Sequence, residues 1–336
     1  MRVGWYRALG WIGVWMVFIG LAAGPMAAQV ATPESPTPAS PAVQPRKLAL
    51  GVLRVIQPEI QVTETFTGPD KLVELATQRQ LDWTPHFAAK TRALYRRAQE
   101  VTLRREVWAF EFAFKPLRVV MVDIPQPSGR MQRKPVWYMV YRIRYRGGNL
   151  APQKQEDGTV APVVTEHPQG RIFFPQFLLT AHELKETYFD QVIPAAMEVI
   201  TKREKPDGPL HDSVTIASKP IPLTREEDAP GVWGVAMWQD VDPRIDFLSI
   251  DVKGLTNAYR PVDPPGAYKP GDPAGTGRQL LSKTLRLYFW KPGDSVEETE
   301  DEVHFGIPVE EDPDRQADLL RVYGVQRRVD YEWVYR

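Results

Sequence analysis

The residues with the clearest chemical potential are three arginines in the stretch VWYMVYRIRYRGG, residues 136–148. The two-residue period of a β-strand places Arg142, Arg144 and Arg146 on one side and a row from Trp137 to Tyr145 on the other. Two interpretations fit: the arginines bind an anionic partner, or they are the solvated end of a structural strand. We expect the aromatic row to be core and the arginines to lie at an exposed rim, as candidate partner contacts.

Other residue types that carry chemistry do not form a recognisable motif. His182 lies in HELKE, which lacks the second histidine that a helical zinc motif needs. The run DVDPRIDFLSID, residues 240–251, spaces its aspartates for calcium but lacks the glycine and closing glutamate of a calcium loop. There is no G-x-S-x-G elbow and no phosphate-binding loop. We therefore predict no catalytic residue, no metal site and no cofactor.

Tryptophans offer a further binding chemistry, because sugar faces pack on exposed aromatic rings. Seven lie beyond the N-terminal segment: Trp83, Trp108, Trp137, Trp233, Trp238, Trp290 and Trp333. Four of these, at positions 108, 137, 290 and 333, sit in alternating runs, where core packing is expected. A carbohydrate-binding module or a glycan-processing enzyme is the alternative function that these residues leave open.

Composition limits the class of partner and the source of stability. The 336 residues contain 42 Lys and Arg and 42 Asp and Glu, so no net field attracts nucleic acid, and we predict no nucleic-acid partner. The absence of cysteine excludes disulfides, thiolate zinc sites and a cysteine nucleophile. A packed apolar core must supply the stability.

The N-terminus predicts export. Arg2 and Arg7 precede an uncharged apolar run and a small-residue stretch, with no further charge before Glu34. This order is typical of a signal peptide over residues 1–28, although residues 8–28 are also long enough for an uncleaved membrane anchor. A proline-rich linker follows over residues 29–47. We expect the rest of the chain to be extracytoplasmic, periplasmic or secreted.

The remaining chain changes from helical to β patterning. Residues 48–106 are predicted to form a helical N-terminal arm, with two amphipathic helices over residues 69–105. Residues 107–336 alternate in short runs separated by Pro, Gly and Asp, which predicts a β-sandwich, or two sandwiches divided near residue 230. Within this region DQVIPAAMEVITKRE is expected to be a helix, VTIASKPIPL a strand, and the acidic residues 294–314 solvated loops.

The order of these runs resembles the immunoglobulin-like sandwich domains of bacterial exported proteins. The matching features are WYMVYRIRY, the strand ending FFPQFLLTAHE, and the turn and return strand of APGVWGVAMWQDVDPRIDFLSIDVKGL. The resemblance covers roughly residues 107–288. It implies a mostly β, immunoglobulin-like sandwich, α+β overall with its helical arm, that serves as an interaction or structural module of the cell envelope. Its partner would be an envelope protein or a polysaccharide, and no functional residue is transferred from the family.

Overall fold

Alternating apolar residues place much of the chain in strands, and the protein is mostly β, with 44% strand and 13% helix. The computed structural model describes residues 54–57, 59–68, 102–226, 229–269, 271–273, 275–293 and 303–336. The chain divides into two units, Met1–Val43 and Gln44–Arg336, and all described residues belong to the second. The predicted signal peptide, the linker and residues 69–101 of the predicted helical arm lie outside the described residues.

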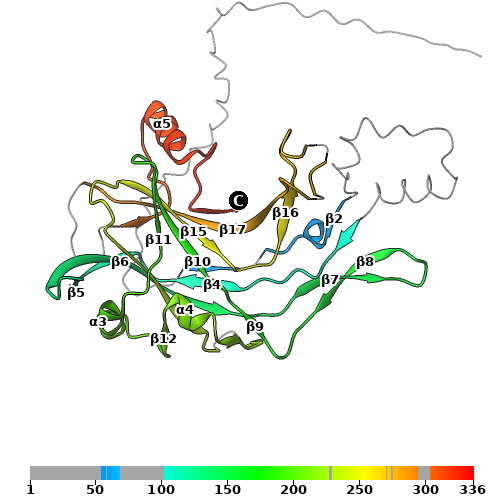
Figure 1. Cartoon of the computed structure of the whole chain (residues 1–336), viewed down its shortest axis with the longest axis horizontal. Coiled ribbons are helices and arrows are strands. Elements are labelled where there is room, and N and C mark those ends of the chain that lie inside the picture. Colours follow the sequence, from blue (N-terminus) through cyan, green and yellow to red (C-terminus); the bar gives the residue numbers. More distant parts are fainter. Residues whose placement is uncertain are drawn as a thin grey trace, which may run out of the picture. The chain divides into compact units, whose positions relative to one another are not determined.

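Two large sheets form the unit (Figure 1). The first sheet has the order β1-β4-β6-β14-β12, and β5 also pairs with β6. Its strands are β1 (Arg54–Ile56), β4 (Glu111–Phe114), β5 (Arg118–Pro125), β6 (Met131–Arg144), β12 (Leu210–His211) and β14 (Val232–Gln239). All of its pairings are antiparallel except that of β12 with β14.

The second sheet has the order β11-β10-β15-β17-β16, and β18 and β19 also pair with β17. Its strands are β10 (Gln176–Ala181), β11 (Glu186–Phe189), β15 (Phe247–Lys253), β16 (Tyr259–Val262), β17 (Gln279–Trp290), β18 (His304–Phe305) and β19 (Tyr331–Tyr335). The described residues also form three short strand pairs: β2 (Phe66–Thr67) with β3 (Leu103–Arg104), β7 (Asn149–Lys154) with β8 (Val160–Thr165), and β9 (Arg171–Ile172) with β13 (Pro220–Ile221).

The main core lies between the two sheets. One buried cluster contains Tyr141 of β6, Trp238 of β14, Ile250 of β15 and Leu287 of β17. β14 pairs with β6, and β15 pairs with β10, so strands from both sides of residue 230 pair in each sheet. The described strands therefore do not separate into two sandwiches at residue 230.

Each sheet is also covered on its outer face by a helix. Helix α3 (Pro194–Glu204) buries Ile200 against Tyr138 and Val140 of the first sheet, in a second apolar cluster. Helix α5 (Pro313–Tyr323) buries Tyr323 against Tyr288 of the second sheet, in a third. The described residues also form two shorter helical elements, the 3-10 helix η1 (Val62–Thr65) and helix α4 (Ser213–Ile216).

The described elements confirm some local predictions and correct others. The helix predicted in DQVIPAAMEVITKRE is α3. Within residues 48–106, the described segments form β1, η1, β2 and β3. The helices predicted over residues 69–105 lie outside the described residues up to residue 101 and stay a prediction. VTIASKPIPL begins with α4 instead of a strand, because the Asp212 side chain accepts hydrogen bonds from the first-turn amides of Val214 and Thr215.

Candidate functional site

The aromatic row of β6 lies in the main core, as predicted. Trp137, Met139, Tyr141, Ile143 and Tyr145 are all fully buried there. Gly234 of β14 is the cross-strand partner of Tyr141. A Cβ at this glycine would lie 2.3 Å from Cζ of the tyrosine ring, so glycine leaves the space that the ring fills.

The arginines on the opposite face of β6 do not form an exposed row. Arg144 has only 8% of its surface exposed, so the prediction of a solvated rim is wrong at this residue. The reason is Glu111, the buried cross-strand neighbour on β4, whose Oε1 lies 3.5 Å from NH1 of Arg144. The Nε of Arg146 lies 3.7 Å from the other oxygen of Glu111, and its NH1 donates to the Glu226 carbonyl at 2.6 Å.

Arg142 differs from its two neighbours. Its guanidinium lies 5.6 Å from the centre of the Trp233 ring, and it forms no hydrogen bond or ion pair with any described residue. Burial, and then the charge of Arg144, lower the pKa of Arg142. Half-buried arginines are usually paired, so this side chain is a candidate binding residue. Its role as a partner contact stays a prediction.

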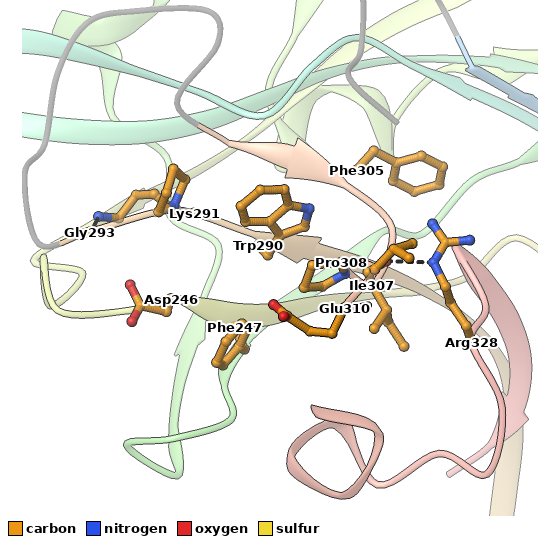
Figure 2. A pocket seen from close by; sticks show the side chains of 12 residues that line it. Asp246, Phe247, Trp290, Lys291, Gly293, Phe305, Ile307, Pro308, Glu310 and Arg328 are labelled. Atoms are coloured by element: carbon orange, nitrogen blue, oxygen red, sulfur yellow. Dashed lines mark hydrogen bonds between the residues drawn. The ribbon is translucent and has the colours of Figure 1, made fainter. Parts of the chain in front are cut away.

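A pocket of about 290 Å³ opens beside the end of β17 (Figure 2). Trp290 and its cross-strand partner Phe247 contribute aromatic side chains, and Ile307 and Pro308 contribute apolar groups from the segment after β18. The Trp290 ring is also stacked on the His304 ring, with ring centres 4.3 Å apart. The pocket therefore presents a partly prearranged aromatic and apolar surface.

Charged groups of both signs surround this apolar surface. Figure 2 shows Asp246 and Lys291 at one end of the pocket and Arg328 at the other. Lys291 is buried and donates to the Gly293 carbonyl, and its backbone amide donates to the Asp246 carbonyl at 2.7 Å. The Nε of Arg328 donates to the Ile307 carbonyl at 2.8 Å. These contacts tie the ends of β15, β17 and β18 to the segment that precedes β19.

His167 is bound in a polar cluster around Glu106. The His167 ring lies 3.1 Å from the Glu106 carboxylate, which also accepts hydrogen bonds from Asn149, Thr165 and Arg171. Burial raises the pKa of Glu106, but these hydrogen bonds outweigh it and lower the pKa to about 2. Asn149 and Thr165 are paired ends of β7 and β8, so the cluster holds that hairpin to the segment that precedes β4.

His182 is half-buried against helix α5. Its ring packs 5.1 Å from that of Tyr323 in α5, and its Nε2 is buried without a hydrogen bond to a described residue. Burial, with a smaller effect of the Arg286 charge, lowers the pKa of His182 to about 4. The imidazole is therefore neutral at physiological pH and fills space between the second sheet and α5.

The aspartates of residues 240–251 point to different partners. Asp240 pairs with Lys134 at 2.8 Å, and Asp251 pairs with Arg286 at 2.8 Å on β17. Asp242 binds Arg244 within its own turn. In the part of the chain that the structure describes, no group of three or more His, Asp or Glu residues is placed to hold a metal ion.

The tryptophans do not form an exposed platform. Trp137, Trp233 and Trp238 are buried, and Trp108, Trp290 and Trp333 are half-buried. Trp83 lies outside the described residues. Of the six described, Trp290 is the one whose ring lines the pocket in Figure 2. The alternating sequence pattern predicted a core position for Trp290. The pattern could not show that β17 ends beside a pocket, which forms only in the folded protein.

Comparison with known proteins gives no match for this chain. No family model matches it, and no similarity was found to a curated protein or to a solved structure. Among the described residues, no helix is long and apolar enough to cross a membrane.

Proposed function

We propose that this protein is an exported, non-enzymatic interaction module of the cell envelope, and that the Trp290 pocket receives an apolar side chain of a partner protein. The carrying observation is the pocket itself: aromatic and apolar walls from Trp290, Phe247 and Ile307, with charges of both signs at the ends. Binding sites of this kind combine an apolar interior with a few polar groups that orient the ligand.

Export is supported by the order of residues at the N-terminus. Arg2 and Arg7, the apolar run after them and the proline-rich residues 29–47 have the layout of a secretory segment and a spacer. The lack of cysteine is compatible with a fold stabilised by its core alone. Fractionation of cells should find the protein outside the cytoplasm, and a steady-state cytosolic precursor would contradict this part of the proposal.

The immunoglobulin-like assignment belongs to the same proposal. Two mostly antiparallel sheets that share one core, without a disulfide, are compatible with a sandwich of this type. The chain would then be an elaborated member, because α3 and α5 cover the outer faces of both sheets. Sandwiches of this class commonly present loops and strand ends to partners, and the Trp290 pocket lies at such an end.

A protein partner fits the pocket better than a glycan. Sugar binding uses an open aromatic face, but one face of the Trp290 ring is already stacked on His304. A pocket of about 290 Å³ accepts one apolar side chain, and Lys291, Arg328, Asp246 and Glu310 can contact the polar backbone and flanking residues around it. The alternative, carbohydrate binding, is tested in the same experiment.

The test compares envelope extracts passed over immobilised wild-type protein, Trp290→Ala and Phe174→Ala. Phe174 is a matched control, because it is 66% exposed and does not line the pocket. We expect a defined envelope protein to be retained by the wild type and Phe174→Ala and to be lost with Trp290→Ala, all three being folded by circular dichroism. Quenching of Trp290 fluorescence by an envelope glycan, without a protein partner, would instead support the carbohydrate alternative and contradict the proposal.

A further inference from the structure

Strand β19 of the second sheet has one edge without a strand partner. Among the described strands it pairs with β17 alone, and its sequence YEWVY contains neither proline nor lysine. Edge strands are usually protected by proline, lysine or a bulge, because their unpaired backbone groups can bind another strand. The edge strands β8 and β16 follow this rule, since they contain Pro162 and Pro261. β19 lacks this protection.

The pairing of β19 with β17 shows which backbone groups face the free edge. Ser282 and Arg336 exchange both backbone hydrogen bonds, and the Tyr288 amide donates to the Asp330 carbonyl at 3.0 Å. Hydrogen-bonded positions alternate along an antiparallel pair, so the even-numbered residues of β19 bond to β17 and the odd-numbered ones face outwards. The outward-facing residues are Tyr331, Trp333 and Tyr335. Among the described residues, no hydrogen bond occupies their amides and carbonyls.

The side chains of the same three residues lie on one face of β19, because side chains alternate along a strand. All three line a pocket of about 430 Å³. The Trp333 ring centre lies 5.3 Å from Nζ of Lys283, and the Tyr335 hydroxyl donates to Glu64 at 2.6 Å. Tyr331 is 39% exposed. The free edge therefore combines open backbone groups with an aromatic row that is already held in place at two of its three positions.

The sequence of β19 is symmetric about Trp333, with a tyrosine two positions away in each direction. A two-fold axis through Trp333 places Tyr331 opposite the partner's Tyr335, and Trp333 opposite the partner's Trp333. All of these positions face the free edge, so the amides of each copy meet the carbonyls of the other. Glu332 lies opposite the partner's Val334, so this register brings no like charges together.

We propose that two copies of this chain form a two-fold symmetric dimer by antiparallel pairing of β19 with the partner's β19. A two-fold interface requires a surface that is complementary to itself, and the symmetric strand edge meets this requirement. The aromatic rows of both copies would lie on one face of the joined sheet, where cross-strand aromatic pairs stabilise the contact. The surface is separate from the Trp290 pocket, so this inference does not depend on the proposed function.

Sedimentation equilibrium of the full chain tests the dimer, with Tyr331→Pro as the decisive variant. The Tyr331 amide faces the free edge, so proline removes a hydrogen bond to the partner and none to β17. We expect the wild type to dimerise with increasing concentration, and Tyr331→Pro to stay monomeric while folded by circular dichroism. Tyr331→Phe is the matched control, because it keeps both the amide and the ring and should still dimerise.

Disulfide cross-linking tests the register, since the chain has no cysteine of its own. Paired residues on the axis have Cα atoms about 5.5 Å apart, within the range of about 4.4–6.8 Å that a disulfide spans. Trp333→Cys should therefore form a linked dimer on oxidation. Tyr331→Cys alone should not, but an equimolar mixture of Tyr331→Cys and Tyr335→Cys should. This measurement also tests the proposal if Tyr331→Pro fails to fold.

Three results would overturn the proposal: a wild type that is monomeric at every concentration measured, a dimer that folded Tyr331→Pro retains, or self-linking of Tyr331→Cys equal to that of Trp333→Cys. A monomeric wild type that retains an envelope protein, lost with Tyr331→Pro, would assign the edge to a different chain and would also overturn it. Trp290→Ala should remain dimeric, so failure of the pocket proposal is distinguishable from failure of this one.

Discussion

At the scale of single residues, Trp137 gives the sharpest stability prediction. It is fully buried in the main core between the two sheets. Replacement with Ala removes a large ring and leaves a cavity, which should lower the free energy of unfolding by about 3–5 kcal/mol. Chemical denaturation of the purified variant measures the loss.

Trp137→Phe is the matched control for that variant. The indole Nε1 of Trp137 is buried without a hydrogen bond to a described residue, so Phe removes an unsatisfied donor and leaves a smaller cavity. Its loss of stability should therefore be clearly smaller than that of Trp137→Ala. A nearly neutral Trp137→Ala would contradict the assignment of this row to the core.

The β6 row also shows what a sequence can and cannot predict about a residue. The period of two was enough to separate Trp137 and Tyr141 from the arginines, because a strand alternates its side chains. The two-residue period could not show that Glu111 of β4 lies beside Arg144, because these paired residues are far apart in the sequence. The buried ion pair depends on that register, which the sequence pattern does not contain.

At the scale of elements, we expect the packing of helix α5 to depend on the protonation state of His182. In the folded protein burial lowers the pKa of His182 from its usual 6.5 to about 4, and its ring packs against Tyr323 of α5. Protons therefore bind the unfolded state more readily below pH 6.5. The stability contributed by neutral His182 is fully present above pH 6.5 and is lost as the pH falls towards 4.

His182→Phe tests this dependence, because phenylalanine keeps an aromatic ring at the position and cannot be protonated. We expect the difference in urea midpoint between His182→Phe and the wild type to grow in favour of the variant as the pH falls from 6.5 to 4. Carboxylates such as Glu183 titrate in both proteins, so the difference isolates the histidine. A difference that stays constant with pH would show that His182 titrates normally in the folded state.

Helix α5 itself could have been found from the sequence. Asp312 caps its first turn, Pro313 follows at the first helical position, and Gly324 ends it at φ +71°. These signals lie in the stretch PVEEDPD and after it, where the density of acidic residues favoured a loop prediction. The loop prediction ended at residue 314 and overlaps only the first two residues of α5, and the capping signals that define the rest of the helix were local and readable.

At the scale of the whole molecule, the sequence was enough to predict a mostly β fold. It was not enough to predict which strands would meet to form the pocket. Short alternating runs indicated a mostly β protein, which the structure confirms. The Trp290 pocket, by contrast, is assembled from residues 246–247, 290–293, 305, 307–310 and 328, which meet only after β15, β17 and β18 have paired. No local pattern contains that meeting point, so the site required the structure.

The pairing across residue 230 leads to the last prediction, which concerns fragments of the unit. A fragment over residues 44–229 keeps β6 but lacks β14, and it keeps β10 but lacks β15 and β17. Each sheet then loses a central strand, and the main core loses Trp238, Ile250 and Leu287. We expect neither this fragment nor residues 230–336 to unfold cooperatively alone, because each exposes half of a shared core.

Equimolar mixing of the two fragments should recover a single denaturation transition, monitored by tryptophan fluorescence and circular dichroism together. A cooperative transition in either isolated fragment would contradict this prediction. It would show that the unit consists of two independent domains with a boundary near residue 230, the alternative that the sequence had left open.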